Sequence, residues 1–76
     1  MWLSDFILLF DFNRAGEETH ENNCFTIIDY TTYEEMFVIT TFEEFQNFIT
    51  ANGDFRIAYI APSHSLEYGV DVVVRR

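Results

Sequence analysis

The residue types that most often carry chemistry are scarce in this chain, which has two histidines and a single cysteine. His20 and Cys24 are four residues apart, but the segment around them reads as a loop, and two candidate ligands do not make a zinc site. The acidic surroundings of Cys24 oppose formation of the thiolate that nucleophilic catalysis needs. We therefore expect no metal and no cofactor, and we interpret Cys24 as a buried strand cysteine.

His64 lies between two serines, in the segment Pro62-Ser63-His64-Ser65. A Ser/His hydrolase would also need an oriented nucleophile and an oxyanion hole. Neither a nucleophile elbow nor a glycine-rich loop occurs in a chain with three glycines. Turn chemistry explains this segment better, and we do not expect an enzyme.

Carboxylates, in contrast, are abundant. Thirteen Asp and Glu face four arginines and no lysine, and the formal net charge is −9. Adjacent carboxylates point to opposite faces of a strand, and on a helix they diverge by about 100°, so the Glu-Glu pairs do not form a catalytic dyad. A scattered acidic surface suits a basic partner instead. The candidate contacts are seven glutamates: Glu17, Glu18, Glu21, Glu34, Glu35, Glu43 and Glu44.

The same charge excludes other partners. Affinity for a phosphate backbone or an anionic membrane comes from Lys and Arg, so we expect no direct binding to nucleic acid or membrane. The N-terminal apolar run has no basic region before it, and Asp5 interrupts it, which argues against a signal peptide. No stretch is long enough to span a bilayer. We expect a cytoplasmic protein.

Residue patterns predict one α+β domain over residues 1–76. Thr41-Phe42-Glu43-Glu44 matches a capping box, apolar residues then recur at helical spacing, and Gly53 suits the end of a helix over 42–52. Strands are predicted over 6–12, 24–30, 36–40, 55–61 and 70–74. The expected fold is a mostly antiparallel five-stranded sheet with one amphipathic helix, in the order β-β-β-α-β-β.

One short helix can cover only part of such a sheet. Phe25 and Ile27 would then lie on the opposite face from Ile28 and Tyr30, and an uncovered apolar face usually marks an interaction site. A homodimer through this face is one solution. On that hypothesis, Phe25→Asp or Ile27→Asp would dissociate the dimer.

These observations favour a small acidic inhibitor that occupies the basic surface of another protein, most plausibly a nucleic-acid-binding enzyme or complex. In size and charge, although not in any motif, the chain is similar to small acidic inhibitors made by phages, such as anti-CRISPR and anti-restriction proteins. That likeness implies a possible DNA mimic acting in the cytoplasm of a host cell. The alternatives are a homo-oligomeric accessory or structural domain, and an immunity protein or antitoxin.

Overall fold

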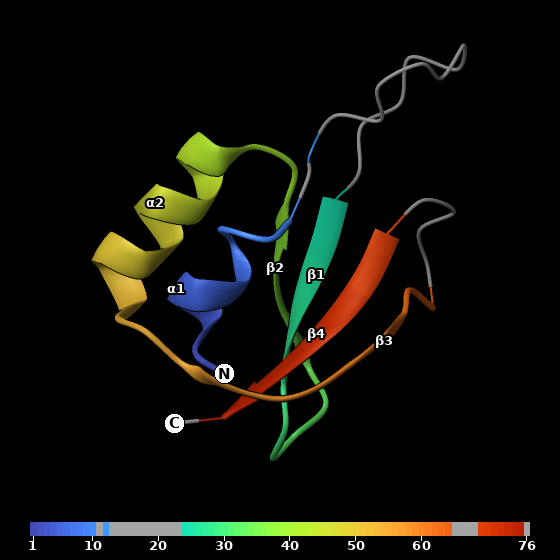
Figure 1. Cartoon of the computed structure of the whole chain (residues 1–76). Helices are drawn as coiled ribbons and strands as arrows, with labels where there is room; N and C mark the ends of the chain where they lie inside the picture. Colours follow the sequence, from blue (N-terminus) through green and yellow to red (C-terminus); the bar gives the residue numbers. More distant parts are fainter. Residues whose placement is uncertain (11, 13–23, 65–68, 76) are drawn as a thin grey trace, which may run out of the picture.

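In the computed structural model, which describes residues 1–10, 12, 24–64 and 69–75, two helices lie on the same side of a four-stranded sheet (Figure 1). Along the chain the elements are α1 (Leu3–Phe6), β1 (Cys24–Asp29), β2 (Glu35–Ile39), α2 (Phe42–Asn52), β3 (Arg56–Pro62) and β4 (Gly69–Arg75). The strand order across the sheet is β2-β1-β4-β3. The first and last strands are therefore neighbours at its centre.

The sheet is mixed, and the predicted five-stranded, mostly antiparallel sheet in the order β-β-β-α-β-β is wrong. β1 and β4 pair in parallel, whereas the outer pairs β1–β2 and β3–β4 are antiparallel. Because α2 connects two hairpins, the chain crosses from one edge of the sheet to the other, and this brings β4 beside β1 (Figure 1). Four of the five predicted strands are present, with ends within two residues of those expected.

The predicted strand over 6–12 is the one that is missing. Its first residues belong to α1 and the turn after it. Leu3, Phe6 and Ile7 follow the i, i+3, i+4 spacing of a helix and are all buried, whereas Leu8 and Leu9 are exposed. A short apolar run is compatible with the two-residue period of a strand and with the roughly 3.6-residue period of a helix. Here the helical period prevails because it turns three apolar side chains at once toward the sheet.

Contacts with the start of β3 hold α1 in place. The Leu3 N–H donates to the Phe55 carbonyl at 2.8 Å, and the Ile57 N–H donates to the Met1 carbonyl at 2.9 Å. The Asp54 carboxylate accepts from both the backbone N–H and the hydroxyl of Ser4. These bonds supply partners for the first N–H groups of a helix that has no side-chain cap at its own N-terminus.

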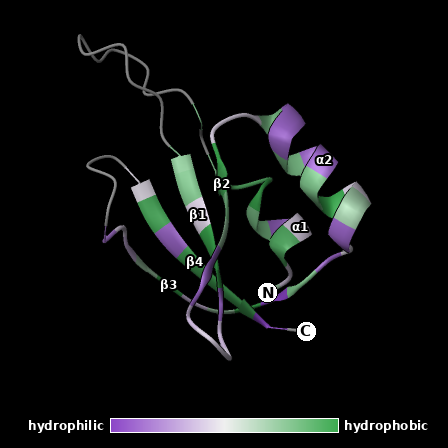
Figure 2. Ribbon diagram, turned by 180° about the vertical axis from the view of Figure 1, so that it is seen from behind, coloured by the Kyte–Doolittle hydropathy of each residue, from purple (hydrophilic) through white to green (hydrophobic). Residues whose placement is uncertain are grey.

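The helix predicted over 42–52 is confirmed with both of its ends. Thr41 Oγ1 accepts from the Glu44 N–H at 3.1 Å, which is half of the capping box. Glu44 completes the motif one residue earlier than expected, because its Oε1 accepts from the Thr40 N–H at 3.1 Å and from the Thr40 hydroxyl. Gly53 ends the helix at φ 83°, a left-handed conformation that favours glycine. Figure 2 shows both hydrophobic and hydrophilic residues along α2, as expected for an amphipathic helix.

The core lies between the two helices and one face of the sheet, which we call the covered face. Eleven buried apolar residues form it: Leu3, Phe6, Ile7, Phe25, Ile27, Ile39, Phe45, Phe48, Phe55, Val72 and Val74. Phe25 is fully buried, and four other phenylalanine rings lie within 6.4 Å of its ring between centroids. Phenylalanine packing therefore supplies the stabilisation that a chain with one cysteine cannot obtain from an internal disulfide. Within the described part of the chain, no helix is long and apolar enough to cross a membrane.

The helical register of α1 can be tested with a matched pair of leucines. Leu3→Ala should lower the free energy of unfolding by about 2–5 kcal/mol, because Leu3 is fully buried. Leu8→Ala should change it by less than about 0.5 kcal/mol, because Leu8 is 78% exposed. Urea denaturation of both variants measures the difference. Equal losses would contradict the helical register, since a strand over 6–12 would place Leu8 inward.

Candidate functional site

The face of the sheet opposite the helices, which we call the open face, brings together the polar and aromatic residues that the core does not use. On the central strands it carries Thr26, Ile28, Asp71 and Val73, all of which are buried. Around them lie more exposed side chains from the edge strands and the turns, namely Tyr30, Tyr33, Glu35, Tyr59, Ala61 and His64. This face is the candidate functional site.

Two β-bulges, one in each edge strand, determine which side chains reach the open face. In β3 the register shifts between Ile57 and Tyr59, so Ile57 lies opposite Val74 while Tyr59 lies opposite Val73. In β2, Glu35 lies opposite Ile28 after a similar shift. Without these bulges, the alternation of strand side chains would direct Tyr59 and Glu35 to the covered face. Bulges often redirect side chains next to functional sites.

The β1–β2 turn adds two aromatic rings to this face. Tyr33 has a φ of 59°, which is uncommon for a residue other than glycine and strained for a bulky side chain. Its N–H donates to the Asp29 carbonyl at 2.7 Å, and its ring lies 6.1 Å from that of Tyr30. The phenol of Tyr33 also lies near Tyr59 and raises the pKa of Tyr59. The turn thus links β1 to β3 across the open face.

His64 and Asp71 form the only ion pair between residues that the structure describes. The His64 Nδ1 lies 2.7 Å from Asp71 Oδ2, and the His64 N–H donates to the same oxygen at 3.4 Å. The hydrogen bond and the negative charge of Asp71 raise the pKa of His64, and the charge of Glu35 acts in the same direction. Asp71 is almost fully buried, whereas the side chain of His64 is 62% exposed. His64 therefore closes the solvent side of Asp71.

Two buried oxygen atoms at this pair have no hydrogen-bond partner among the residues that the structure describes. They are Asp71 Oδ1 and Thr26 Oγ1, both buried, on residues that lie opposite each other in the parallel β1–β4 register. A buried oxygen without a partner costs free energy, and such atoms call for a specific explanation in a folded protein. Here, the two oxygen atoms lie at the centre of the open face and can each accept a hydrogen bond from a ligand.

The exposed side chains enclose a hollow of about 260 Å³ over these atoms. Its lining consists of Ile28, Tyr33, Tyr59, Ala61, His64, Asp71 and Val73. The hollow therefore has an apolar floor, two tyrosines, one buried carboxylate and one histidine. It is slightly smaller than the roughly 300–1,000 Å³ typical of small-molecule pockets, so we expect it to suit a single side chain better than a cofactor.

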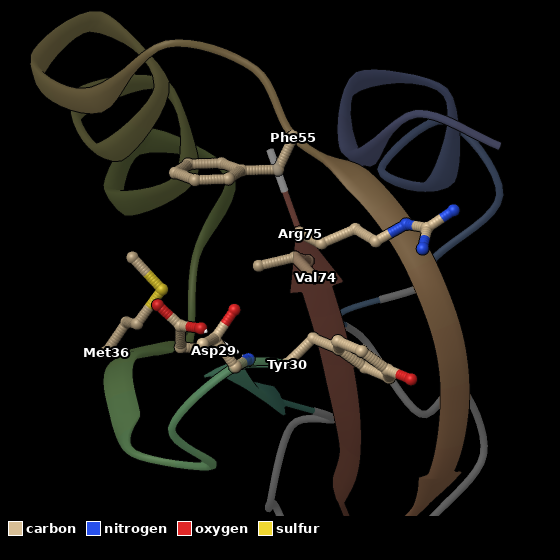
Figure 3. A pocket seen from close by; sticks show the side chains of 7 residues that line it. Asp29, Tyr30, Met36, Phe55, Val74 and Arg75 are labelled. Atoms are coloured by element: carbon tan, nitrogen blue, oxygen red, sulfur yellow. Dashed lines mark hydrogen bonds between the residues drawn. The ribbon is translucent and has the colours of Figure 1, made fainter.

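A second hollow, of about 530 Å³, lies at the β1–β2 turn, where the core reaches the end of the sheet (Figure 3). Its apolar wall consists of Met36, Phe55 and Val74. Asp29 is at its rim, but its Oδ1 already accepts from the Thr31 N–H at 2.7 Å. Arg75 also lines the hollow, yet its side chain extends away from Met36 (Figure 3). Polar atoms make up most of its exposed lining, but none of the described residues that line it has a buried polar atom without a hydrogen-bond partner, so nothing in this hollow calls for a ligand.

The structure divides the seven predicted contact glutamates into groups. Glu34 and Glu35 are exposed at the β1–β2 turn, and Glu43 and Glu44 lie at the start of α2, at the other end of β2 (Figure 1). Four strand residues, Met36 to Ile39, and the turn after them separate the groups, and the strand alone spans about 14 Å from Glu35 to its other end. Glu44 is partly committed to the helix cap, and hydrogen bonds from Thr40 lower its pKa. The other three, Glu17, Glu18 and Glu21, lie outside the described residues.

Other sequence-based interpretations fare differently. Phe25 and Ile27, which the dimer hypothesis placed on an uncovered face, are fully buried beneath the helices. Cys24 is half-buried at the start of β1, and His20 lies outside the described residues. In the described part of the chain, no group of three His, Cys, Asp or Glu side chains could hold a metal ion.

Sequence reasoning missed the His64–Asp71 pair and the tyrosines around it. His64 was interpreted through its neighbouring serines, and Asp71 interrupts a run of valines in β4. An acid within an apolar strand was the available signal, because a buried carboxylate is rare unless it has a partner. Nothing in the sequence, however, indicates which cation faces it.

The His64–Asp71 pair predicts a pH-dependent stability. Because the folded state raises the pKa of His64, its contribution should be fully present below the unfolded value of about 6.5 and should be lost as the pH rises through the folded value. His64→Gln should therefore destabilise the fold more at about pH 5.5 than at about pH 8. Denaturation of both proteins at the two pH values measures this difference.

Whether Asp71 raises the pKa of His64 can be checked separately. Asp71→Asn should lower the pKa of His64, followed by NMR titration of the imidazole protons, because it removes the carboxylate that favours imidazolium. An unchanged titration would exclude Asp71 as the cause, and a pH-independent effect of His64→Gln would exclude the pair from the stability of the fold.

No protein-family model matches the chain, and the comparisons with curated proteins and with solved structures find no significant match. The open face, its charge and its tyrosines are therefore the basis for the functional argument.

Proposed function

We propose that this protein binds a positively charged surface of another protein through its open face and the adjoining β1–β2 turn. The observation that carries the proposal is an exposed patch in which Glu34 and Glu35 adjoin Tyr30, Tyr33 and Tyr59. Neither glutamate forms an ion pair with another described residue. Tyrosine is enriched among the residues that dominate binding energy at interfaces, and fixed negative charges steer a basic partner toward the patch.

A protein that binds nucleic acid is the partner class that fits best. Its basic groove or stripe provides the clustered Lys and Arg that bind phosphates, and a domain with a net charge of −9 is attracted to the same surface. Occupation of that surface would exclude nucleic acid, so the protein would act as an inhibitor of the phage anti-CRISPR or anti-restriction type. An immunity protein bound to a basic toxin would use the same physics.

The proposal depends on a compact patch and not on an imitation of the phosphate backbone. Phosphates recur at about 3.4 Å along one strand of a duplex, whereas the described glutamates fall into two groups at opposite ends of β2 (Figure 1). The patch at the β1–β2 turn combines charge with aromatic area. The group at the start of α2 has fewer free acceptors, because Glu44 Oε1 serves the helix cap.

Charge reversal at the two ends of the molecule tests this assignment. The immobilised protein should retain a nucleic-acid-binding protein from a host lysate, and salt or added duplex DNA should release it. Glu34→Lys with Glu35→Lys should lower the affinity for that protein by about tenfold or more, since each reversal replaces an attraction with a repulsion. Surface plasmon resonance with the purified partner measures the loss.

The matched control is Asp5→Lys with Glu43→Lys, which changes the net charge equally at exposed positions of α1 and α2. It should weaken binding much less. Equal losses for the two double variants would point to net charge alone, and retention of binding after reversal at the turn would exclude the patch. A stable dimer in light scattering, with no partner retained, would favour the homo-oligomeric alternative.

A further inference from the structure

We propose that the 260 Å³ hollow of the open face is a receptor for one arginine side chain of the basic partner, whose guanidinium inserts between the two tyrosines and binds Asp71. This inference rests on the proposed function and specifies its central contact. Four features of the hollow support it: an unused carboxylate oxygen, aromatic walls, its size, and a histidine that can yield its place.

The carboxylate of Asp71 is the first feature. Its Oδ2 lies 2.7 Å from His64 Nδ1, while its Oδ1 is buried and has no hydrogen-bond partner in the described part of the chain. Thr26 Oγ1, on the facing residue of β1, also lacks one. A guanidinium carries five N–H donors in a fixed planar arrangement, so it can satisfy Asp71 Oδ1 and still donate to a second acceptor. A charge-assisted bond of this kind is stronger than a neutral one.

The aromatic walls are the second feature. Tyr33 and Tyr59 line the hollow from two different elements, and the phenol of Tyr33 lies near enough to raise the pKa of Tyr59. Tyr30, whose ring lies 6.1 Å from that of Tyr33, extends this aromatic surface. A cation over the face of a tyrosine is attracted to its π-electrons. The planar guanidinium stacks on such rings and is less strongly hydrated than an ammonium, which favours arginine over lysine.

Size and position are the third feature. The hollow falls below the usual volume range of small-molecule pockets. Its floor of Ile28 and Val73 is apolar and buried, which suits the methylene stem of a long side chain. The exposed Glu35, which lies opposite Ile28 in the sheet, adds negative charge to this face. The entrance therefore attracts a cation, and the interior accepts an apolar stem.

His64 is the fourth feature, because it occupies the position where a ligand cation would enter. Its side chain is 62% exposed. His64 follows β3, which is an edge strand of the sheet. The titratable groups that line the same hollow are Asp71 from β4, Tyr59 from β3 and Tyr33 from the β1–β2 turn. The charge of Glu35 on β2 also acts on His64. When His64 is protonated, it competes with a guanidinium for Asp71 and repels it. Binding should therefore become tighter as the pH rises and His64 loses its proton.

The experiment uses short capped peptides in which glycine alternates with arginine, lysine or citrulline, titrated into the full chain at low salt and followed by amide NMR. The arginine peptide should shift the amide signals of Ile28, Tyr59 and Asp71. The lysine peptide should bind more weakly, and the citrulline peptide, which lacks the charge, should leave these signals unmoved. This design tests the hollow without requiring the natural partner.

Matched variants separate the hollow from general acidity. Asp71→Asn should weaken binding of the arginine peptide by about tenfold or more, as expected for the loss of a hydrogen bond to a charged group. Asp5→Asn makes the same chemical change at an exposed position of α1, on the opposite side of the sheet (Figure 1), and should have little effect. Tyr59→Leu keeps every charge and should also weaken binding, which provides a second test if Asp71→Asn unfolds the protein.

The pH dependence provides an independent readout. Affinity for the arginine peptide should rise between about pH 5.5 and pH 8, across the range in which histidine titrates, and His64→Gln should abolish that rise although His20 remains. A rise that persists in His64→Gln would exclude His64 as the competing group.

The remaining outcomes distinguish this inference from the proposed function. If arginine and lysine peptides bind equally and Asp71→Asn matches Asp5→Asn, the hollow has no special role, and only diffuse attraction to basic partners remains. If none of the peptides binds even at low salt, both the hollow and the acidic binding function are wrong.

Discussion

The parallel pairing of β1 with β4 is the constraint on which the rest of the structure depends. It places two apolar strands side by side at the centre of the sheet, where both faces are buried. On the covered face, Phe25 and Val72 belong to the core against which both helices pack. On the open face, the same register sets Thr26 beside Asp71. A polar pair is thereby fixed at the most enclosed position of a surface that no described helix covers.

The exposed part of the site depends on the edge strands, and the two bulges explain why the sequence could not predict it. Alternation along a strand correctly separates Phe25 and Ile27 from Ile28, because β1 keeps a regular alternation of faces. The same alternation predicts the wrong face for Glu35 and Tyr59, because a bulge in each edge strand moves these side chains to the open face. A bulge depends on pairing with a partner strand and leaves no periodic signal in its own residues. The acids could be counted from the sequence, but their division into two groups could not be foreseen.

The predicted secondary structure was correct wherever a local signal determined it. The helix over 42–52 has a cap, a periodic apolar face and a terminal glycine, all within thirteen residues of the chain, so it needs no tertiary information. The segment 6–12 has only an apolar run, which a strand or a helix could use. Its outcome depends on Asp54 and Phe55, nearly fifty residues later, which hold α1 against the sheet. The order of the strands across the sheet depends on such distant contacts too, and the sequence did not predict it.

Within the described residues, the strained non-glycine backbone and the buried polar atoms without a hydrogen-bond partner both lie on the open face. Tyr33 adopts a left-handed backbone conformation, which costs a bulky residue free energy. Asp71 Oδ1 and Thr26 Oγ1 are buried without a partner among the described residues, and three tyrosines are exposed close together. A chain of 76 residues buries too little surface to tolerate such costs easily. In the covered core, by contrast, the local sequence and the packing agree. Conflicts between local preference and global fold are expected at functional sites, and their concentration on one face is the physical reason to look for the partner there.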